Sequence, residues 1–199
     1  QIAVKICDET VKKYPDAYGS FMCKQLKVTI QQKSVNFRAE DVAVPGEPSK
    51  IIITSKNIDK LYFRIIKPGW DFNNNESYDQ EDLIKKYKEF KPVHAWEQDM
   101  KDDKDFNSHN LEIKIPALEL GYYVILAATD KDFKTAKQAI AYTGIGVSNI
   151  SYIERRSYTD ETYDFTVMHR ETGEPLQGVK AQIYYKEYNY TLRKYQIKK

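Results

Sequence analysis

The chain has 199 residues, of which 41% are hydrophobic and 30% are charged, as is typical of a globular protein. Its 31 basic residues nearly balance its 29 acidic residues. A nucleic-acid-binding surface needs a basic excess, so we expect no nucleic-acid partner. No run approaches the ~20 apolar residues of a membrane-spanning helix, so we also expect no direct membrane insertion.

Two short helices are predicted at the start of the chain. Apolar residues recur at spacings of three and four over residues 1–14 and again over 20–32, and Pro15 separates the two runs. Ser20 is placed to cap the second helix. We therefore expect residues 1–33 to form a helical hairpin. Because the chain opens inside a helical pattern, we expect it to be part of a longer protein, and its lack of a signal-peptide pattern therefore indicates nothing about its compartment.

The two cysteines, Cys7 and Cys23, lie near the apolar stripes of the two predicted helices. One interpretation, which we favour, is that they pack as small buried thiols between the helices. The alternative is a disulfide, which needs Cα atoms within about 7 Å of each other. Two cysteines are too few for a cysteine-based zinc site.

From residue 34 the apolar period changes from helical to two, which indicates strands and predicts a β-sandwich over residues 34–147. Gly121–Ala128 is almost continuously apolar, so we expect a central strand that is covered on both faces. One helix is predicted within the sandwich, from Asp79 as its N-cap to Glu89. The other predicted strands are Phe37–Val44, Lys50–Thr54, Leu61–Ile66, Val93–Glu97, Leu111–Ile115 and Ala139–Gly146.

A domain boundary is predicted at Val147–Asn149, and residues 148–199 are expected to begin a second β domain. This segment has room for only about four strands, so we expect a truncated sandwich. Its predicted strands are Ile150–Ile153, Tyr163–Met168 and Val179–Tyr185. An unpaired edge strand in such a domain is a template for an edge-strand dimer.

A structural hairpin is predicted between the last two strands. Its turn residues are Thr172, Gly173, Pro175, Leu176 and Gly178. We expect Leu176 to pack under the end of the sandwich and the final strand to contribute to its core.

Residues with catalytic or metal-binding chemistry are scattered along the chain. His94, His109 and His169 lie on different predicted elements and lack the spacing of metal ligands. The sequence has no glycine-rich phosphate loop, no nucleophile elbow and no paired carboxylates in a context that would tune their pKa values. We therefore expect no catalytic residues, no metal, no cofactor and no enzymatic activity.

One acidic run is similar to a calcium-binding loop. Asp103, Asp105 and Asn107 have the right spacing, but Ser108 replaces the glycine of such loops and Lys114 replaces the bidentate glutamate. We interpret the run as a solvated acidic loop.

Three aromatic residues, Trp70, Phe72 and Tyr78, flank a polar run of the chain. Aromatic side chains on a polar loop can stack on sugars or anchor a protein partner. The alternative is that they cap one end of the sandwich.

Several segments together resemble bacterial alpha-2-macroglobulin-like proteins. Tyr163–Ala181 resembles the hairpin of macroglobulin-type β-sandwiches, with His169 where an aspartate is common and Val179 where an alanine is common. Ile115–Asp130 is similar to a strand pair of the preceding domain, and Ile145–Arg156 is similar to the junction between the two. The helical lead-in Tyr14–Gln31, followed by Pro45–Ile65, also resembles large envelope-associated members of the family.

The resemblance implies macroglobulin or immunoglobulin-like sandwiches within a long secreted or envelope-associated bacterial protein that traps proteases. The thioester motif of the family, Cys-x-Glu-Gln, occurs at neither cysteine. The role implied for this chain is a non-catalytic scaffold. Its partners would be neighbouring domains and, through the full protein, a target protease. The alternative hypothesis is an extracellular glycan- or protein-binding module that uses the aromatic loop.

Overall fold

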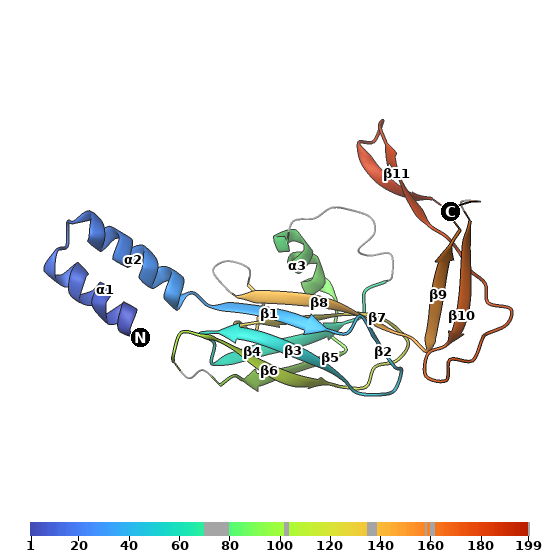
Figure 1. Cartoon of the computed structure of the whole chain (residues 1–199), viewed down its shortest axis with the longest axis horizontal. Helices are drawn as coiled ribbons and strands as arrows, with labels where there is room; N and C mark the ends of the chain where they lie inside the picture. Colours follow the sequence, from blue (N-terminus) through green and yellow to red (C-terminus); the bar gives the residue numbers. More distant parts are fainter. Residues whose placement is uncertain (70–79, 102–103, 135–138, 158, 160–161, 199) are drawn as a thin grey trace.

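The structure is a computed structural model that describes residues 1–69, 80–101, 104–134, 139–157, 159 and 162–198. It confirms a mainly β chain with a helical pair ahead of a β-sandwich (Figure 1). The helices are α1 (Ile2–Lys13), α2 (Tyr18–Gln31) and α3 (Gln80–Glu89). The strands are β1 (Ser34–Ala39), β2 (Val42–Ala43), β3 (Ser49–Lys56), β4 (Lys60–Ile66), β5 (His94–Asp99), β6 (Ser108–Ile115), β7 (Gly121–Ala128), β8 (Ile140–Val147), β9 (Ile150–Arg156), β10 (Tyr163–His169), β11 (Tyr185–Asn189) and β12 (Lys194–Lys198).

The sandwich consists of a three-stranded sheet, in the order β1-β3-β6, and a five-stranded sheet, in the order β2-β8-β7-β4-β5. All neighbouring strands are antiparallel except β2 and β8. Alternate residues of each strand face the partner sheet, as the period-two pattern requires. Fully buried members of the shared core include Ile51, Ile53, Leu61, Ile65, Ile115 and Ile125.

Strand β7 lies inside the five-stranded sheet and is covered on both faces, as its sequence predicts. Tyr123, Ile125 and Ala127 face the sandwich core. Val124 and Leu126 point the other way, into a second apolar cluster. This double coverage explains why the strand is continuously apolar and does not alternate with polar residues.

Helix α3 forms a third layer over the outer face of the five-stranded sheet (Figure 1). Its buried residues are Ile84 and Tyr87, and the Tyr87 ring packs edge-on against Tyr142 of β8 with 5.3 Å between the ring centroids. Glu81 and Asp82 occupy its first turn, where the helix dipole stabilises negatively charged side chains. The predicted N-cap, Asp79, lies outside the described residues.

The predicted strand Phe37–Val44 is wrong, because the chain changes sheets within it. β1 ends at Ala39 and β2 begins at Val42. The carbonyl of Asp41 accepts a hydrogen bond from the Gly146 amide at 2.8 Å, which fixes the crossing against β8. The alternation of Phe37 and Ala39 stops at Glu40 and Asp41, which lie at the crossing, and apolar residues resume at Val42.

The predicted N-cap role of Ser20 is also wrong. Helix α2 begins earlier than expected, with Ala17 at its N-cap, so Ser20 lies within the helix and is fully buried. Its hydroxyl donates to the carbonyl of Tyr14 and lies 3.2 Å from the carbonyl of Thr10. The serine therefore satisfies carbonyl groups at the C-terminal end of α1 and joins the two helices.

The last part of the described chain forms two separate two-stranded sheets, β9 with β10 and β11 with β12. The predicted core strand Val179–Tyr185 is wrong: residues 179–184 form no strand, and Ile183 is 70% exposed. The alternating pattern is present, but no neighbouring strand among the described residues pairs with it. Leu176 is 37% exposed, so its predicted burial under the sandwich is wrong as well.

Two adjacent isoleucines of β3 test the sandwich core. Ile53 is fully buried, whereas Ile52 is 40% exposed on the outer face of the same strand. We expect Ile53→Ala to lower the free energy of unfolding by about 2–5 kcal/mol, because it removes buried apolar area and leaves a cavity. Ile52→Ala should cost about 1 kcal/mol or less. Urea unfolding followed by circular dichroism measures both, and equal losses would contradict the assigned register.

Candidate interaction surfaces

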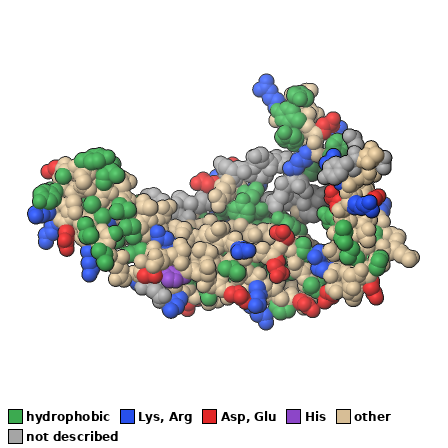
Figure 2. Space-filling view, in the orientation of Figure 1, with side chains coloured by type: hydrophobic (Ala, Val, Ile, Leu, Met, Phe, Trp, Pro, Cys, Tyr) green, Lys and Arg blue, Asp and Glu red, His purple; other side chains and the backbone are tan. Residues whose placement is uncertain are grey.

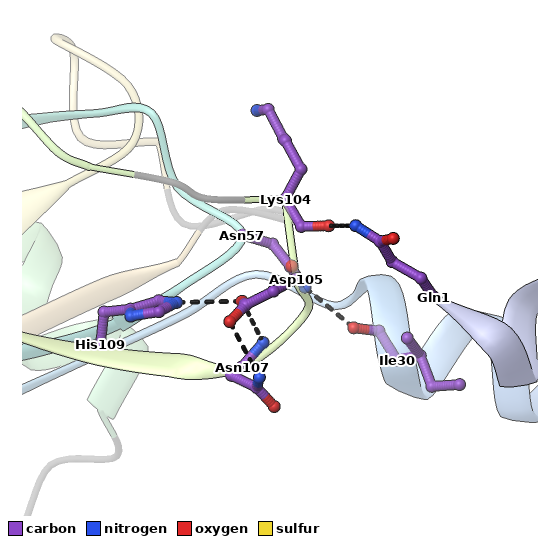
Figure 3. Close-up of polar contacts among 7 residues, drawn as sticks. All are labelled: Gln1, Ile30, Asn57, Lys104, Asp105, Asn107 and His109. Atoms are coloured by element: carbon purple, nitrogen blue, oxygen red, sulfur yellow. Dashed lines mark hydrogen bonds and ion pairs between the residues drawn. The ribbon is translucent and has the colours of Figure 1, made fainter.

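The helical pair is tied to one end of the sandwich by side-chain amides (Figure 3). Asn57, at the turn between β3 and β4, donates from Nδ2 to the carbonyls of Ile30 (2.9 Å) and Gln32 (3.0 Å) at the end of α2. Gln1 donates from Nε2 to the carbonyl of Lys104 at 3.1 Å. Asn57 has a φ of 56°, a left-handed conformation that asparagine tolerates better than most residues. These bonds hold the start of α1 and the end of α2 against the same end of the sandwich.

The loop before β6 is organised around the Asp105 carboxylate (Figure 3). Oδ1 accepts from the Asn107 amide at 2.8 Å and lies 2.9 Å from His109 Nε2, while Oδ2 accepts from Asn107 Nδ2 at 2.8 Å. These bonds, led by the backbone amide, hold the pKa of Asp105 well below its usual value. Asp103 lies outside the described residues. The described residues contain no group of three or more His, Cys, Asp or Glu side chains arranged to hold a metal ion.

Helix α2 carries an uncharged apolar face that points away from α1. It consists of Tyr18, Phe21, Met22, Leu26 and Val28, which are between 47% and 77% exposed. Figure 2 shows hydrophobic side chains gathered on the helical pair. The opposite side of α2 carries the buried Ser20 and packs on α1. Contiguous exposed apolar surface of this kind marks interaction sites in folded proteins.

One face of the β9–β10 sheet carries exposed apolar side chains beside two charged ones, Glu154 and Arg156. Cross-strand neighbours place Ile150, Tyr152, Phe165 and Val167 on it, and the rings of Tyr152 and Phe165 meet edge-on with 5.9 Å between centroids. Tyr152 is nevertheless 63% exposed and Phe165 is 45% exposed. A two-stranded sheet is marginally stable alone, so a face of this composition favours burial against another surface.

The β11–β12 sheet carries a cluster of tyrosines. Tyr188 and Tyr195 are cross-strand partners with ring centroids 5.1 Å apart, and Tyr190 lies 5.1 Å from Tyr188. Tyr190 is 86% exposed. Tyrosine suits exposed interfaces because its ring supplies apolar area while its hydroxyl stays hydrated.

The predicted hairpin after β10 forms a compact turn. The Gly173 amide donates to the His169 carbonyl at 2.9 Å, and Gly173 has a φ of 71°. Thr172 Oγ1 accepts from the Glu174 amide at 3.3 Å, and the Leu176 amide donates to Val167 at 2.9 Å. Two further predicted positions complete it: Pro175, which bridges to Met168, and Gly178, with a φ of 68°.

Arg170 fixes this turn to the start of β9, a role that the sequence pattern did not indicate. Its Nε donates to the Ser148 carbonyl at 2.9 Å and its Nη2 to the Ile150 carbonyl at 2.7 Å. Its own amide donates to the Asn149 carbonyl at 2.8 Å. A planar guanidinium can reach both of these carbonyl groups at once in this way, whereas a lysine ammonium has no such fork.

A groove of about 440 Å³, partly open to solvent, lies between the edge strands β5 and β6. Its lining includes His94, Trp96 and Gln98 from β5 and Leu111 from β6. The Trp96 ring stacks on Phe63 of the core, with centroids 4.8 Å apart and planes 8° from parallel. Its aromatic side chain therefore completes the core at this edge.

The three predicted histidines are not brought together. His94, His109 and His169 lie on β5, β6 and β10, respectively. Trp70, Phe72 and Tyr78 lie outside the described residues, so the aromatic-loop hypothesis stays a prediction. Cys7 and Cys23 are free thiols in the structure; Cys7 is 3% exposed and Cys23 is half-buried.

Comparison with known proteins shows no matching family model and no matching curated protein. Among solved structures, the chain is similar to the CARDB domain of a Pyrococcus furiosus protein crystallised with di-metal ions. The TM-score is 0.34 and the identity 12%, over 58% of this chain and 92% of that domain. It is also similar to a superoxide reductase (neelaredoxin) from Ignicoccus hospitalis, with a TM-score of 0.33 and 9% identity, over 63% of this chain and 87% of the other.

A third similar structure is a Salmonella alpha-2-macroglobulin reacted with methylamine. Its TM-score is 0.36 and its identity 8%, over 84% of this chain but only 13% of that protein. None of the three similarities is strong enough to assign a function. The class established for this chain is a mainly β protein with a β-sandwich and an N-terminal helical pair.

Replacing Arg170 should loosen the turn after β10. We expect Arg170→Lys to speed cleavage within residues 150–198 by a broad-specificity protease, because lysine lacks the planar fork that donates to the Ser148 and Ile150 carbonyls together. The 34–147 segment should remain resistant at the same rate as in the unmodified chain. Arg155→Ala, which removes an exposed arginine from β9, is the matched control. Equal cleavage of both variants would show that Arg170 does not hold this region.

The Asp105 hydrogen bonds should make the stability depend on acidity. The folded-state pKa lies below the unfolded value of about 3.9. The stabilisation is therefore fully present above that value and is lost as the pH falls towards the folded pKa. We expect Asp105→Asn to lower the melting temperature at pH 7, and the difference from the unmodified chain to shrink below about pH 4. A difference that stays constant through acidification would contradict this role.

Proposed function

We propose that the chain is a non-catalytic scaffold segment of an alpha-2-macroglobulin-like, protease-trapping protein that is secreted by bacteria or held in their cell envelope. In this proposal the sandwich acts as a rigid spacer, and the surfaces at its two ends contact neighbouring domains of the same protein. A target protease would meet the complete protein and would not bind a dedicated site on this segment.

The observation that carries the proposal is the distribution of exposed apolar residues. The two sheets bury a common core, and α3 covers a second cluster on the outer face. The helical pair instead exposes Phe21 and Val28, and the β9–β12 region exposes Tyr152, Ile183 and Tyr190. A closed central body between two exposed apolar regions is typical of a unit that is held between partners.

The non-catalytic part of this proposal is supported by the spacing of the histidines and by the partners of the one carboxylate that lies beside a histidine. The three histidines lie on three different strands. The Asp105 carboxylate, next to His109, is occupied by the Asn107 donors of its own loop. The groove between β5 and β6 is partly open to solvent, so it gives less of the water exclusion that strengthens electrostatic catalysis than a closed cavity would.

The family assignment within the proposal rests on the sequence resemblance, above all on Tyr163–Ala181. The turn at Gly173 and Pro175 gives this motif a structural purpose, since it reverses the chain after β10. The cell-envelope location belongs to the same resemblance. No helix among the described residues is long and apolar enough to cross a membrane.

The proposal predicts the size and behaviour of the native protein. An antibody raised against the 199-residue chain should detect, in the envelope or secreted fraction of the producing bacterium, a polypeptide much larger than 23.3 kDa. That polypeptide, once purified, should block cleavage of large protein substrates by a bound protease while small peptide substrates are still cleaved. The isolated 199-residue chain, used as the control, should leave both activities unchanged.

Two outcomes would contradict the proposal. Detection of a cytoplasmic polypeptide no larger than the 199-residue chain would contradict the envelope scaffold role. Equal cleavage of large and small substrates in the presence of the purified large polypeptide would remove the trapping role. Binding to a glycan array that disappears in Trp70→Ala would instead support the alternative, a glycan-binding module.

A further inference from the structure

The helical pair contains two cysteines whose side chains face each other across the interface. Cys7 lies on the face of α1 that packs on α2 and is almost completely buried. Cys23 lies on α2 and is half-buried. The two side chains are close enough to interact, and burial together with Cys23 raises the pKa of the Cys7 thiol.

The way α1 packs on α2 is a second, geometric reason to place Cys7 opposite Cys23. Ser20 Oγ lies 3.2 Å from the carbonyl of Thr10. Thr10 is three residues after Cys7, and Ser20 is three residues before Cys23. Because the helices run in opposite directions, a step of about one turn along each of them leads from the first pair to the second. Cys7 and Cys23 therefore meet as the next pair along the interface.

We propose that Cys7 and Cys23 are a built site for oxidation to an intramolecular disulfide, which locks α1 to α2. The oxidant would be a disulfide donor, either a small-molecule disulfide or a dithiol oxidase. This inference does not depend on the proposed scaffold function, because the two thiols meet whatever the sandwich does.

The two cysteines have different roles in the exchange. Cys23 is the more accessible sulfur, so its thiolate attacks the donor disulfide, forms a mixed disulfide and releases one thiol of the donor. The buried Cys7 then loses its proton and attacks the Cys23 sulfur, which forms the Cys7–Cys23 bond and releases the second donor thiol. The protein loses two protons and two electrons in total, and the donor disulfide is reduced to two thiols.

The surrounding charges keep the pair in place. Lys27 of α2 forms an ion pair with Asp8 of α1, next to Cys7 in the sequence. The Lys27 charge acts to lower the pKa of Cys7, whereas Asp8 acts to raise it. This ion pair crosses the same interface as the two thiols, so it favours the arrangement in which they meet. The locked hairpin would hold the apolar face of α2 outwards.

The test uses the reduced 199-residue protein and glutathione disulfide. After incubation, an acid quench and treatment with N-ethylmaleimide, the intact mass should show a monomer that has lost two hydrogens and carries no maleimide. Peptide mapping should find one cross-link, between the peptides that contain Cys7 and Cys23. Dithiothreitol should restore two maleimide-reactive thiols.

Two single variants separate the roles, with circular dichroism as the check on folding. In Cys7→Ala, glutathione should remain on Cys23, because no second thiol can displace it. In Cys23→Ala, the buried Cys7 should react more slowly than Cys23 does in the first variant. The proposal is overturned if the unmodified protein ends as a stable glutathione adduct or as a disulfide-linked dimer. The peptide map decides this even if a variant fails to fold.

Discussion

The burial of β7 on both faces is the constraint on which the rest of the structure depends. Ile125 faces the core shared with the three-stranded sheet, while Leu126 faces the cluster beneath α3. Each face needs its own cover, so this one strand requires both the second sheet and the helix. Burial of a large aliphatic side chain contributes about 1.5–3 kcal/mol, and β7 buries three of them side by side, Val124, Ile125 and Leu126.

The same constraint separates the closed part of the molecule from the open parts. Strands β4 and β8 lie on either side of β7, and each pairs with a further strand of the sheet. Trp96 closes one edge of the core by stacking on Phe63. The helical pair and the two terminal sheets have no comparable cover among the described residues. The helical pair is joined to the sandwich through polar contacts of Asn57, and Arg170 reaches the carbonyl of Ser148, directly after β8. Polar contacts of this kind fix direction and position, while the apolar faces remain available to partners.

The sequence predicted the elements whose own apolar pattern marks them as buried. The predictions were wrong where strand pairing or helix capping depended on distant parts of the chain. The central strand β7 was predictable because continuous apolarity needs no partner to be recognised. Val179 and Ile183 alternate equally well, yet alternation cannot reveal that no strand lies beside them. Ser20 was misassigned because its partners are carbonyl groups of another helix. Arg170 carried no signal, since any surface arginine looks the same in sequence.

Hydrogen exchange followed by mass spectrometry tests the central claim, that a closed sandwich is flanked by regions with open apolar faces. The amides of β4, β7 and β8 should exchange most slowly, at rates set by global unfolding. The amides of β9–β12 should exchange much faster, through local opening, although their strands are paired. Protection of β9–β12 equal to that of β7 in the isolated chain would contradict the account, because it would mean that this region has its own buried core.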